Sequence, residues 1–138
     1  MPKRSSDSRA RAPTVLLVDD NVDSRDMYRE ALEYAEYRVE DAEDGEEGLS
    51  LALALVPAVV VLDLSMPVMD GYTLARELKK DERTRHIPLI ACSAFADVDS
   101  KQRALAAGCE AFLSKPCLPG DLVTAVENAL RKAAQRQA

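Results

Sequence analysis

The chain has 138 residues, of which 47% are hydrophobic and 30% are charged. This length suits one domain with a single core, and the composition is that of a globular protein and excludes a disordered one. No apolar stretch approaches the roughly 20 residues that cross a membrane, and the N-terminus lacks the hydrophobic segment of a secretory signal.

The formal net charge of −6 is unevenly spread along the chain. Residues 1–12 hold four basic side chains and one acidic one, a charge of +3, which leaves −9 for the remainder. We therefore predict a flexible basic tail over residues 1–13, while the acidic body argues against nucleic acid as the main partner. The three cysteines show no CxxC spacing, which favours free thiols in a reducing cytoplasm over a disulfide framework or a zinc site.

Segments typical of strands and helices alternate five times along the chain. Strands are predicted at about 14–18, 37–42, 58–62, 89–92 and 111–114. Helices are predicted at about 24–36, 46–55, 72–80, 99–107 and from 119 onward, and residues 135–138 are expected to fray. This alternation predicts an α/β domain over residues 14–134, with parallel strands and helices on both faces of the sheet. The first helix is expected to bury a stripe formed by Met27, Ala31, Leu32 and Ala35.

Polar residues stand at or just past the predicted carboxyl ends of four strands. They are Asp19 and Asp20 after the first strand, Asp63 after the third, Ser93 after the fourth and Lys115 after the fifth. In doubly wound sheets, ligands bind beyond the carboxyl ends of the strands. One edge of the sheet is therefore expected to gather three carboxylates, one hydroxyl and one ammonium group.

This set of side chains suits phosphoryl chemistry at a metal ion. Carboxylate oxygens are hard ligands, which favour Mg²⁺ and, less firmly, Mn²⁺ or Ca²⁺. Lys115 offers a positive charge to a phosphate, and Ser93 offers a hydrogen-bond donor. The carboxylate of Asp63 could act as the acceptor nucleophile and form an aspartyl phosphate.

Five short motifs together resemble the receiver domains of bacterial two-component response regulators. They are VDDN at 18–21, LDLSMP at 62–67, DG at 70–71, SA at 93–94 and FLSKP at 112–116. The resemblance covers residues 14 to about 134. It implies a flavodoxin-like, doubly wound sheet of five parallel strands in the order 2-1-3-4-5, with five helices.

The resemblance also implies roles for individual residues. Asp63 would receive a phosphoryl group from a phosphohistidine on a sensor histidine kinase or a phosphotransfer protein. Asp20 would bind Mg²⁺ directly, together with Asp63 and the backbone carbonyl of Ser65. Asp19 would act on the metal ion mainly through water, and Lys115 would pair with the phosphoryl group.

A switch is implied as well. Ser93 would move toward the phosphoryl group, and Phe112 would turn into the space that it leaves, although an aromatic residue on a strand can also be simply part of the core. The change would reach the face formed by the helix at 99–107, the strand at 111–114 and the helix from 119. The Lys115-Pro116 peptide bond is expected to be cis.

The predicted function is that of a stand-alone response regulator, which is not an enzyme beyond its own phosphorylation and dephosphorylation. Its output would be contact with an unknown protein target, without a membrane or direct nucleic acid partner. A receiver domain cut from a hybrid histidine kinase is an alternative. A phosphatase of the haloacid dehalogenase type is disfavoured because it needs a second aspartate where the chain has Ser65. A flavodoxin is disfavoured because Asp19 and Asp20 would repel the phosphate of flavin mononucleotide.

Overall fold

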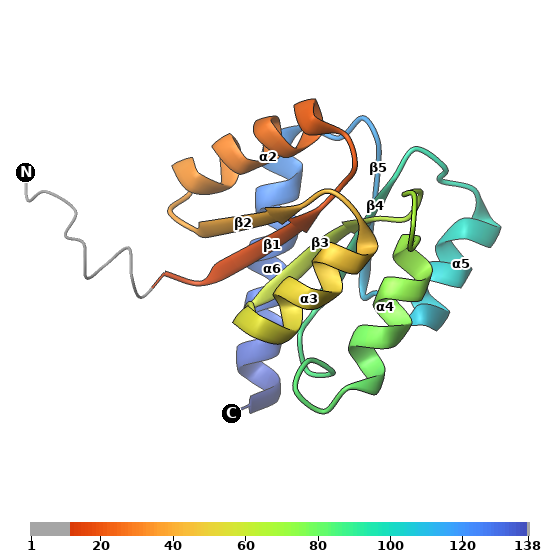
Figure 1. Cartoon of the computed structure of the whole chain (residues 1–138). Coiled ribbons are helices and arrows are strands. Elements are labelled where there is room, and N and C mark those ends of the chain that lie inside the picture. The colour runs from red at the N-terminus through yellow and green to blue at the C-terminus, as the bar shows by residue number, and fades with distance from the viewer. Residues whose placement is uncertain (1–11, 138) are drawn as a thin grey trace, which may run out of the picture.

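A computed structural model describes residues 12–137 and shows a parallel sheet between two layers of helices (Figure 1). The strands are β1 (Thr14–Val18), β2 (Arg38–Ala42), β3 (Val59–Asp63), β4 (Leu89–Ser93) and β5 (Ala111–Ser114). The helices are α2 (Val22–Tyr34), α3 (Gly45–Leu55), α4 (Gly71–Lys80), α5 (Val98–Ala107) and α6 (Pro119–Gln137). The strand order β2-β1-β3-β4-β5 confirms the predicted fold, and the bounds of the predicted strands and of the first four predicted helices shift by no more than two residues.

Successive residues of the central strands pack on opposite faces of the sheet, which explains why their apolar runs are continuous. On β1, Leu16 lies in a buried cluster with Leu74 of α4, whereas its neighbour Leu17 lies in a second cluster with Leu122 of α6. Helices α3, α4 and α5 therefore cover one face of the sheet, and α2 and α6 cover the other (Figure 1). The three central strands, β1, β3 and β4, are therefore buried on both faces.

Four of the helices begin at the carboxyl edge of the sheet with a side-chain cap. The capping residues, whose side chains each accept a backbone N–H three residues further on, are Asn21, Asp44, Asp70 and Asp97. Such caps satisfy N–H groups that the first turn of a helix leaves unpaired. The aspartate of the DG motif, Asp70, is thus a helix cap in this structure.

The buried face of α2 differs from the predicted stripe. Tyr28 and Leu32 are buried, whereas Met27 is 42% exposed. Ala31 and Ala35 instead line a hollow between α2 and α6 together with Met27. The prediction missed Tyr28 because its hydroxyl makes it an ambiguous core residue, and here that hydroxyl finds a partner in the loop between β5 and α6.

Helix α6 continues to Gln137, past residue 135, where the sequence predicted fraying. The guanidinium of Arg136 lies 3.5 Å from the carboxylate of Glu110, so the last turns contact the segment that precedes β5. Residues 1–11, most of the predicted basic tail, lie outside the described residues. Within the described part of the chain, no helix combines the length and the hydropathy needed to cross a bilayer.

Candidate functional site

Three carboxylates lie together at the carboxyl edge of the sheet. Asp19 and Asp20 follow β1, and Asp63 is the last residue of β3, which pairs directly with β1. One side-chain oxygen from each residue lies within 4.8 Å of the others. Asp19 and Asp63 are buried, at 6% and 7% exposure, while Asp20 is exposed to solvent. The structure thus brings together the acids that the sequence placed at two strand ends.

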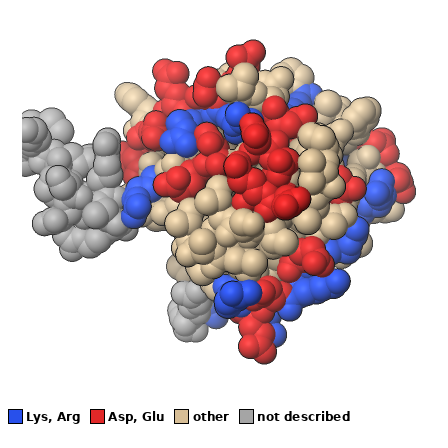
Figure 2. Space-filling model, in the orientation of Figure 1, with Lys and Arg blue, Asp and Glu red and all other residues tan. Residues whose placement is uncertain are grey.

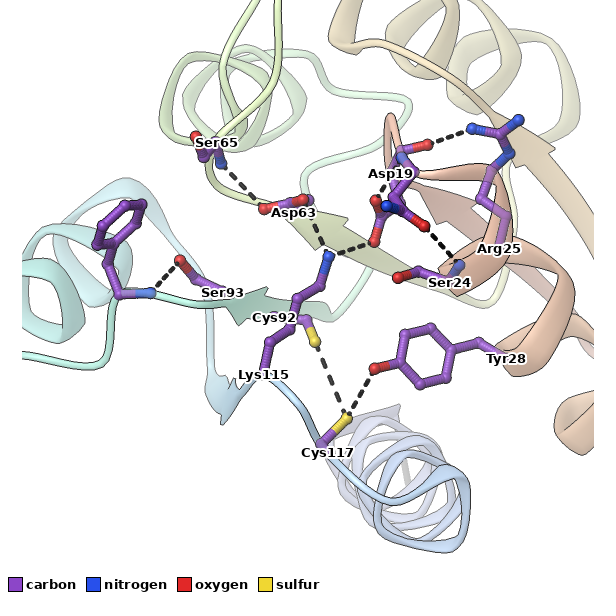
Figure 3. Close-up of polar contacts among 12 residues, drawn as sticks. Asp19, Ser24, Arg25, Tyr28, Asp63, Ser65, Cys92, Ser93, Lys115 and Cys117 are labelled. Carbon is purple, nitrogen blue, oxygen red and sulfur yellow. Dashed lines mark hydrogen bonds and ion pairs between the residues drawn. The ribbon is translucent and has the colours of Figure 1, made fainter.

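Lys115 reaches these carboxylates from the loop after β5 (Figure 3). Its Nζ atom donates to Asp19 Oδ2 at 2.7 Å and to Asp63 Oδ2 at 3.1 Å. The backbone N–H of Lys115 donates to the carbonyl of Ser93 at 2.8 Å, which holds the start of the loop against the end of β4. The Lys115-Pro116 bond is cis, as expected.

Backbone groups fix the other oxygens of the buried pair. The N–H of Ser65 donates to Asp63 Oδ1 at 3.0 Å, and the N–H of Asn21 donates to Asp19 Oδ1 at 2.9 Å. The guanidinium of Arg25 donates to the backbone carbonyl of Asp19 at 2.6 Å. Hydrogen bonds of this kind hold each carboxylate in one orientation, so the site is organised before any ligand binds.

The balance of charge at the site is negative, because three carboxylates face two cations, the ammonium of Lys115 and the guanidinium of Arg25. Burial raises the pKa of Asp63, against the opposing effects of the Ser65 N–H and the Lys115 ammonium, and the nearby Asp19 raises it further. Burial alone would lower the pKa of Lys115, but its hydrogen bond to Asp19 and the charge of Asp63 outweigh that effect and raise it. Lys115 therefore stays charged at neutral pH, and a cation bound beside Asp63 would favour the ionised form of its carboxyl group.

The donor set fits a small divalent cation. The three acids offer oxygen ligands only, and their oxygens are close enough to share one ion after small side-chain rotations. The exposed carboxylate of Asp20 leaves room for the water ligands that Mg²⁺ usually keeps. The carbonyl of Ser65, the fourth predicted ligand, belongs to the loop that follows Asp63 directly.

The two predicted switch residues, Ser93 and Phe112, lie near the three acids. Among the described residues, no hydrogen bond or ion pair joins either of them to these acids. Ser93 is buried at 1% exposure, and its Oγ accepts the N–H of Phe95 at 3.1 Å. Phe112 is half-buried against the core under α4 and α5, and Lys101 Nζ lies 5.9 Å from the centre of its ring. A hollow that includes Ser65 and Ser93 opens beside the strand ends.

A second acidic group lies at the start of α3 and has a structural explanation. Figure 2 shows acidic side chains crowded over this part of the surface. Asp44 Oδ1 accepts the N–H of Glu47 at 2.8 Å, and Glu47 Oε1 accepts the N–H of Glu43 at 2.9 Å. These bonds resemble a capping box, except that Glu47 returns to the N–H of Glu43, one residue before the cap, so Asp44 and Glu47 help to start the helix.

Sequence reasoning missed one close backbone contact. Gly71 packs so tightly against Asp63 that a Cβ atom at residue 71 would overlap the Asp63 carbonyl oxygen. The DG motif therefore pairs a helix cap with a residue that has to lack a side chain, which keeps α4 against the end of β3. The motif itself was visible in the sequence, but its contact with Asp63 was not.

Residues 15–127 match the family model described as the response regulator receiver domain. The chain belongs to this family. It is 36% identical over 103 residues to the polar-differentiation response regulator DivK of Brucella ovis, a match that covers 75% of this chain and 84% of DivK. Longer curated relatives also match, and the chain spans about half of their length.

Solved receiver domains share the fold. The chemotaxis protein CheY4 of Vibrio cholerae is 30% identical with a TM-score of 0.83, over 86% of this chain and 99% of that one. The receiver domain of the sensor histidine kinase PA1611 of Pseudomonas aeruginosa PAO1 is 28% identical with a TM-score of 0.81, over 87% and 98%. That structure holds a magnesium ion coordinated in its active site cleft.

The raised pKa of Asp63 predicts that removing the negative charge of this side chain stabilises the folded receiver domain. Because folding raises this pKa, ionising Asp63 costs folding free energy, and the cost grows as pH rises from the ordinary carboxyl value through the raised one. Without divalent cations near neutral pH, we expect Asp63→Asn to raise the melting temperature above that of wild type, because the variant has no charge to bury at this position. Lys115 would keep Asp19 as its partner.

Calorimetry of the variant and of wild type, over a range of pH, checks this. The difference should vanish below the ordinary carboxyl pKa, where Asp63 is protonated in both the folded and the unfolded state. Asp26→Asn, which changes an exposed acid on α2, is the matched control and should leave the melting temperature unchanged. A lower melting temperature for Asp63→Asn than for wild type at neutral pH would contradict the prediction.

Proposed function

We propose that the chain is a phosphoryl acceptor of two-component signalling, modified at Asp63 by a sensor histidine kinase or a phosphotransfer protein. The observation that carries the proposal is the position of Lys115 Nζ, which contacts Asp19 and Asp63 while Asp20 lies beside them. An acceptor oxygen, a cation for the transferred group and ligands for a metal ion are then all within one site. Phosphoryl transfer needs mainly such alignment and neutralisation of charge.

Mg²⁺ is the proposed cofactor. Asp20, Asp63 and the carbonyl of Ser65 would hold it directly, with Asp19 acting mainly through water. When bound, it supplies positive charge that lowers repulsion between Asp63 and the incoming phosphoryl group. The magnesium ion in the related receiver domain of PA1611 supports this choice of metal.

The protein's own residues perform the transfer. A carboxylate oxygen of Asp63 forms a bond to phosphorus while the phosphorus–nitrogen bond of the donor histidine breaks, and the imidazole keeps the electron pair. Lys115, which already contacts Asp63 Oδ2, is placed to pair with an oxygen of the transferred group. Ser65 N–H keeps its hydrogen bond to Asp63 Oδ1 and so holds the carboxylate in place during attack.

The output of the modification is proposed to be a change of the face formed by α5, β5 and α6. Ser93 would exchange its bond to the Phe95 N–H for one to the phosphoryl group, and Phe112 would move inward from its half-buried position. Phosphorylation can bias such a two-state packing because it binds one state better than the other. An unknown protein target would then read this face.

The proposed setting is the cytoplasm, which suits the three free thiols of the described residues. We propose no direct contact with nucleic acid or membrane and no enzymatic activity beyond self-phosphorylation and dephosphorylation.

A second candidate is the receiver domain of a hybrid histidine kinase, favoured by the similarity to the PA1611 receiver domain. The chemistry at Asp63 is the same in both.

Incubation with Mg²⁺ and acetyl phosphate tests the acceptor role. We expect intact mass spectrometry to show a gain of one phosphoryl group that survives acid and is lost in base, as an acyl phosphate is. Asp63→Asn should abolish the gain, and Asp20→Asn should reduce it because a ligand of the metal ion is lost. Asp70→Asn, at a nearby helix cap, is the control and should be labelled like wild type. Labelling of Asp63→Asn to the wild-type level would refute the assignment.

The switch is tested separately, with beryllofluoride as a mimic of the phosphoryl group. Amide shifts of α5, β5 and α6 should move when the mimic and Mg²⁺ bind, because Ser93 and Phe112 change their contacts. In Lys115→Ala, binding of the mimic should move these shifts much less, while Lys132→Ala, an exposed change on α6, should respond as wild type does. Binding that leaves the α5, β5 and α6 shifts unmoved in wild type would rule out this face as the output.

A further inference from the structure

Two thiols lie close together below Lys115, on the face of the sheet covered by α2 and α6 (Figure 3). The Sγ atoms of Cys92 and Cys117 are 4.0 Å apart, and the hydroxyl of Tyr28 lies 3.3 Å from Cys117 Sγ. Cys92 is buried at 2% exposure, whereas Cys117 is half-buried in the loop between β5 and α6. The remaining cysteine, Cys109, is buried in the core on the opposite face.

Each of the two cysteines lies next to a residue of the phosphoacceptor site. Cys92 precedes Ser93 on β4 and is the register partner of Asp63 on β3. Cys117 follows Lys115 by two residues in the same loop. A covalent bond between the two sulfurs would therefore connect the loop that carries Lys115 to the central part of the sheet.

We propose that Cys92 and Cys117 are a redox-active pair whose oxidation to a disulfide slows phosphoryl acceptance at Asp63. The oxidant would be a small disulfide such as glutathione disulfide. A disulfide is about 2.05 Å long, so its formation has to bring the sulfurs about 2 Å closer. Cys92 is held in the buried strand, so the loop with Cys117 makes most of this movement. The effect on Asp63 rests on the proposed function, but formation of the bond does not.

The chemistry needs two exchange steps. The thiolate of Cys117, the more accessible of the two, attacks one sulfur of glutathione disulfide, and the first glutathione leaves as a thiolate. Burial raises the pKa of the Cys92 thiol to about 12, so this thiol has to lose its proton as its sulfur attacks Cys117 Sγ and releases the second glutathione. Both cysteines are oxidised, both glutathiones are reduced, and the two thiol protons end on the released glutathiones.

Movement of the loop explains why transfer would slow. Lys115 Nζ lies 3.1 Å from Asp63 Oδ2 in the dithiol form, within reach of a group bound to that carboxylate. Misplacing a positioning group by ~1 Å can cost up to about 10²-fold in rate. We therefore expect the disulfide form to accept a phosphoryl group from acetyl phosphate roughly tenfold more slowly than the dithiol form.

The test treats the purified chain with glutathione disulfide, traps free thiols under denaturing conditions and counts them by mass. Wild type should fall from three thiols to one, with a peptide that joins Cys92 to Cys117, and dithiothreitol should restore all three. Cys109→Ala, the matched control, should lose its two remaining thiols to the disulfide. Cys117→Ala should keep the free thiols of Cys92 and Cys109. Circular dichroism confirms that each variant is folded.

The rate of labelling by acetyl phosphate is then compared between the oxidised and reduced forms. A roughly tenfold slowing in wild type and Cys109→Ala, reversed by dithiothreitol and absent in Cys117→Ala, supports the proposal. A glutathione adduct without the internal disulfide, unchanged thiol counts, or a disulfide with an unchanged labelling rate would each overturn it. Failure of the reduced form to accept a phosphoryl group would refute the proposed function, while the thiol counts would still report on the disulfide.

Discussion

The ammonium of Lys115 holds two buried carboxylates of neighbouring strands together, and the rest of the site depends on this contact. Asp19 and Asp63 would repel each other without it, since like charges are costly in a site shielded from water. The ammonium compensates only part of the negative charge of these two carboxylates, and Asp20 adds a third carboxylate beside them. The remaining negative charge means that this edge of the sheet could hold a metal ion.

The sheet supplies the rigidity that this contact needs. Strands β1 and β3 are buried on both faces, so neither can slide without exposing apolar side chains to water. Lys115 arrives on a loop whose first N–H bonds the carbonyl of Ser93, and Gly71 lets α4 pack against the Asp63 backbone. The charged groups are thus placed by packing and backbone hydrogen bonds, while their own attraction to one another refines the arrangement.

Much of the fold and of the site was predictable because the sequence patterns that decide them are local. An apolar run that stops at Asp63 marks a buried strand and the edge at which it ends, and the alternation of elements brings such ends together. The buried face of α2 was not predictable, since Tyr28 enters the core only because a partner from the β5–α6 loop reaches its hydroxyl. The proximity of Cys92 and Cys117 was equally hidden, because these residues are distant in sequence and form no motif.

Paramagnetic broadening by Mn²⁺, added in small amounts to the ¹⁵N-labelled protein, reports where a divalent cation binds and shows whether Asp19, Asp20 and Asp63 form a metal site. Amide signals of residues 19–21 and 63–65 should disappear first, excess Mg²⁺ should restore them, and Asp20→Asn should weaken the broadening. The acids at the start of α3, residues 43–47, are an internal comparison of similar charge. Broadening that begins at residues 43–47, or that is spread evenly over the acidic surface, would rule out a metal site at Asp19, Asp20 and Asp63.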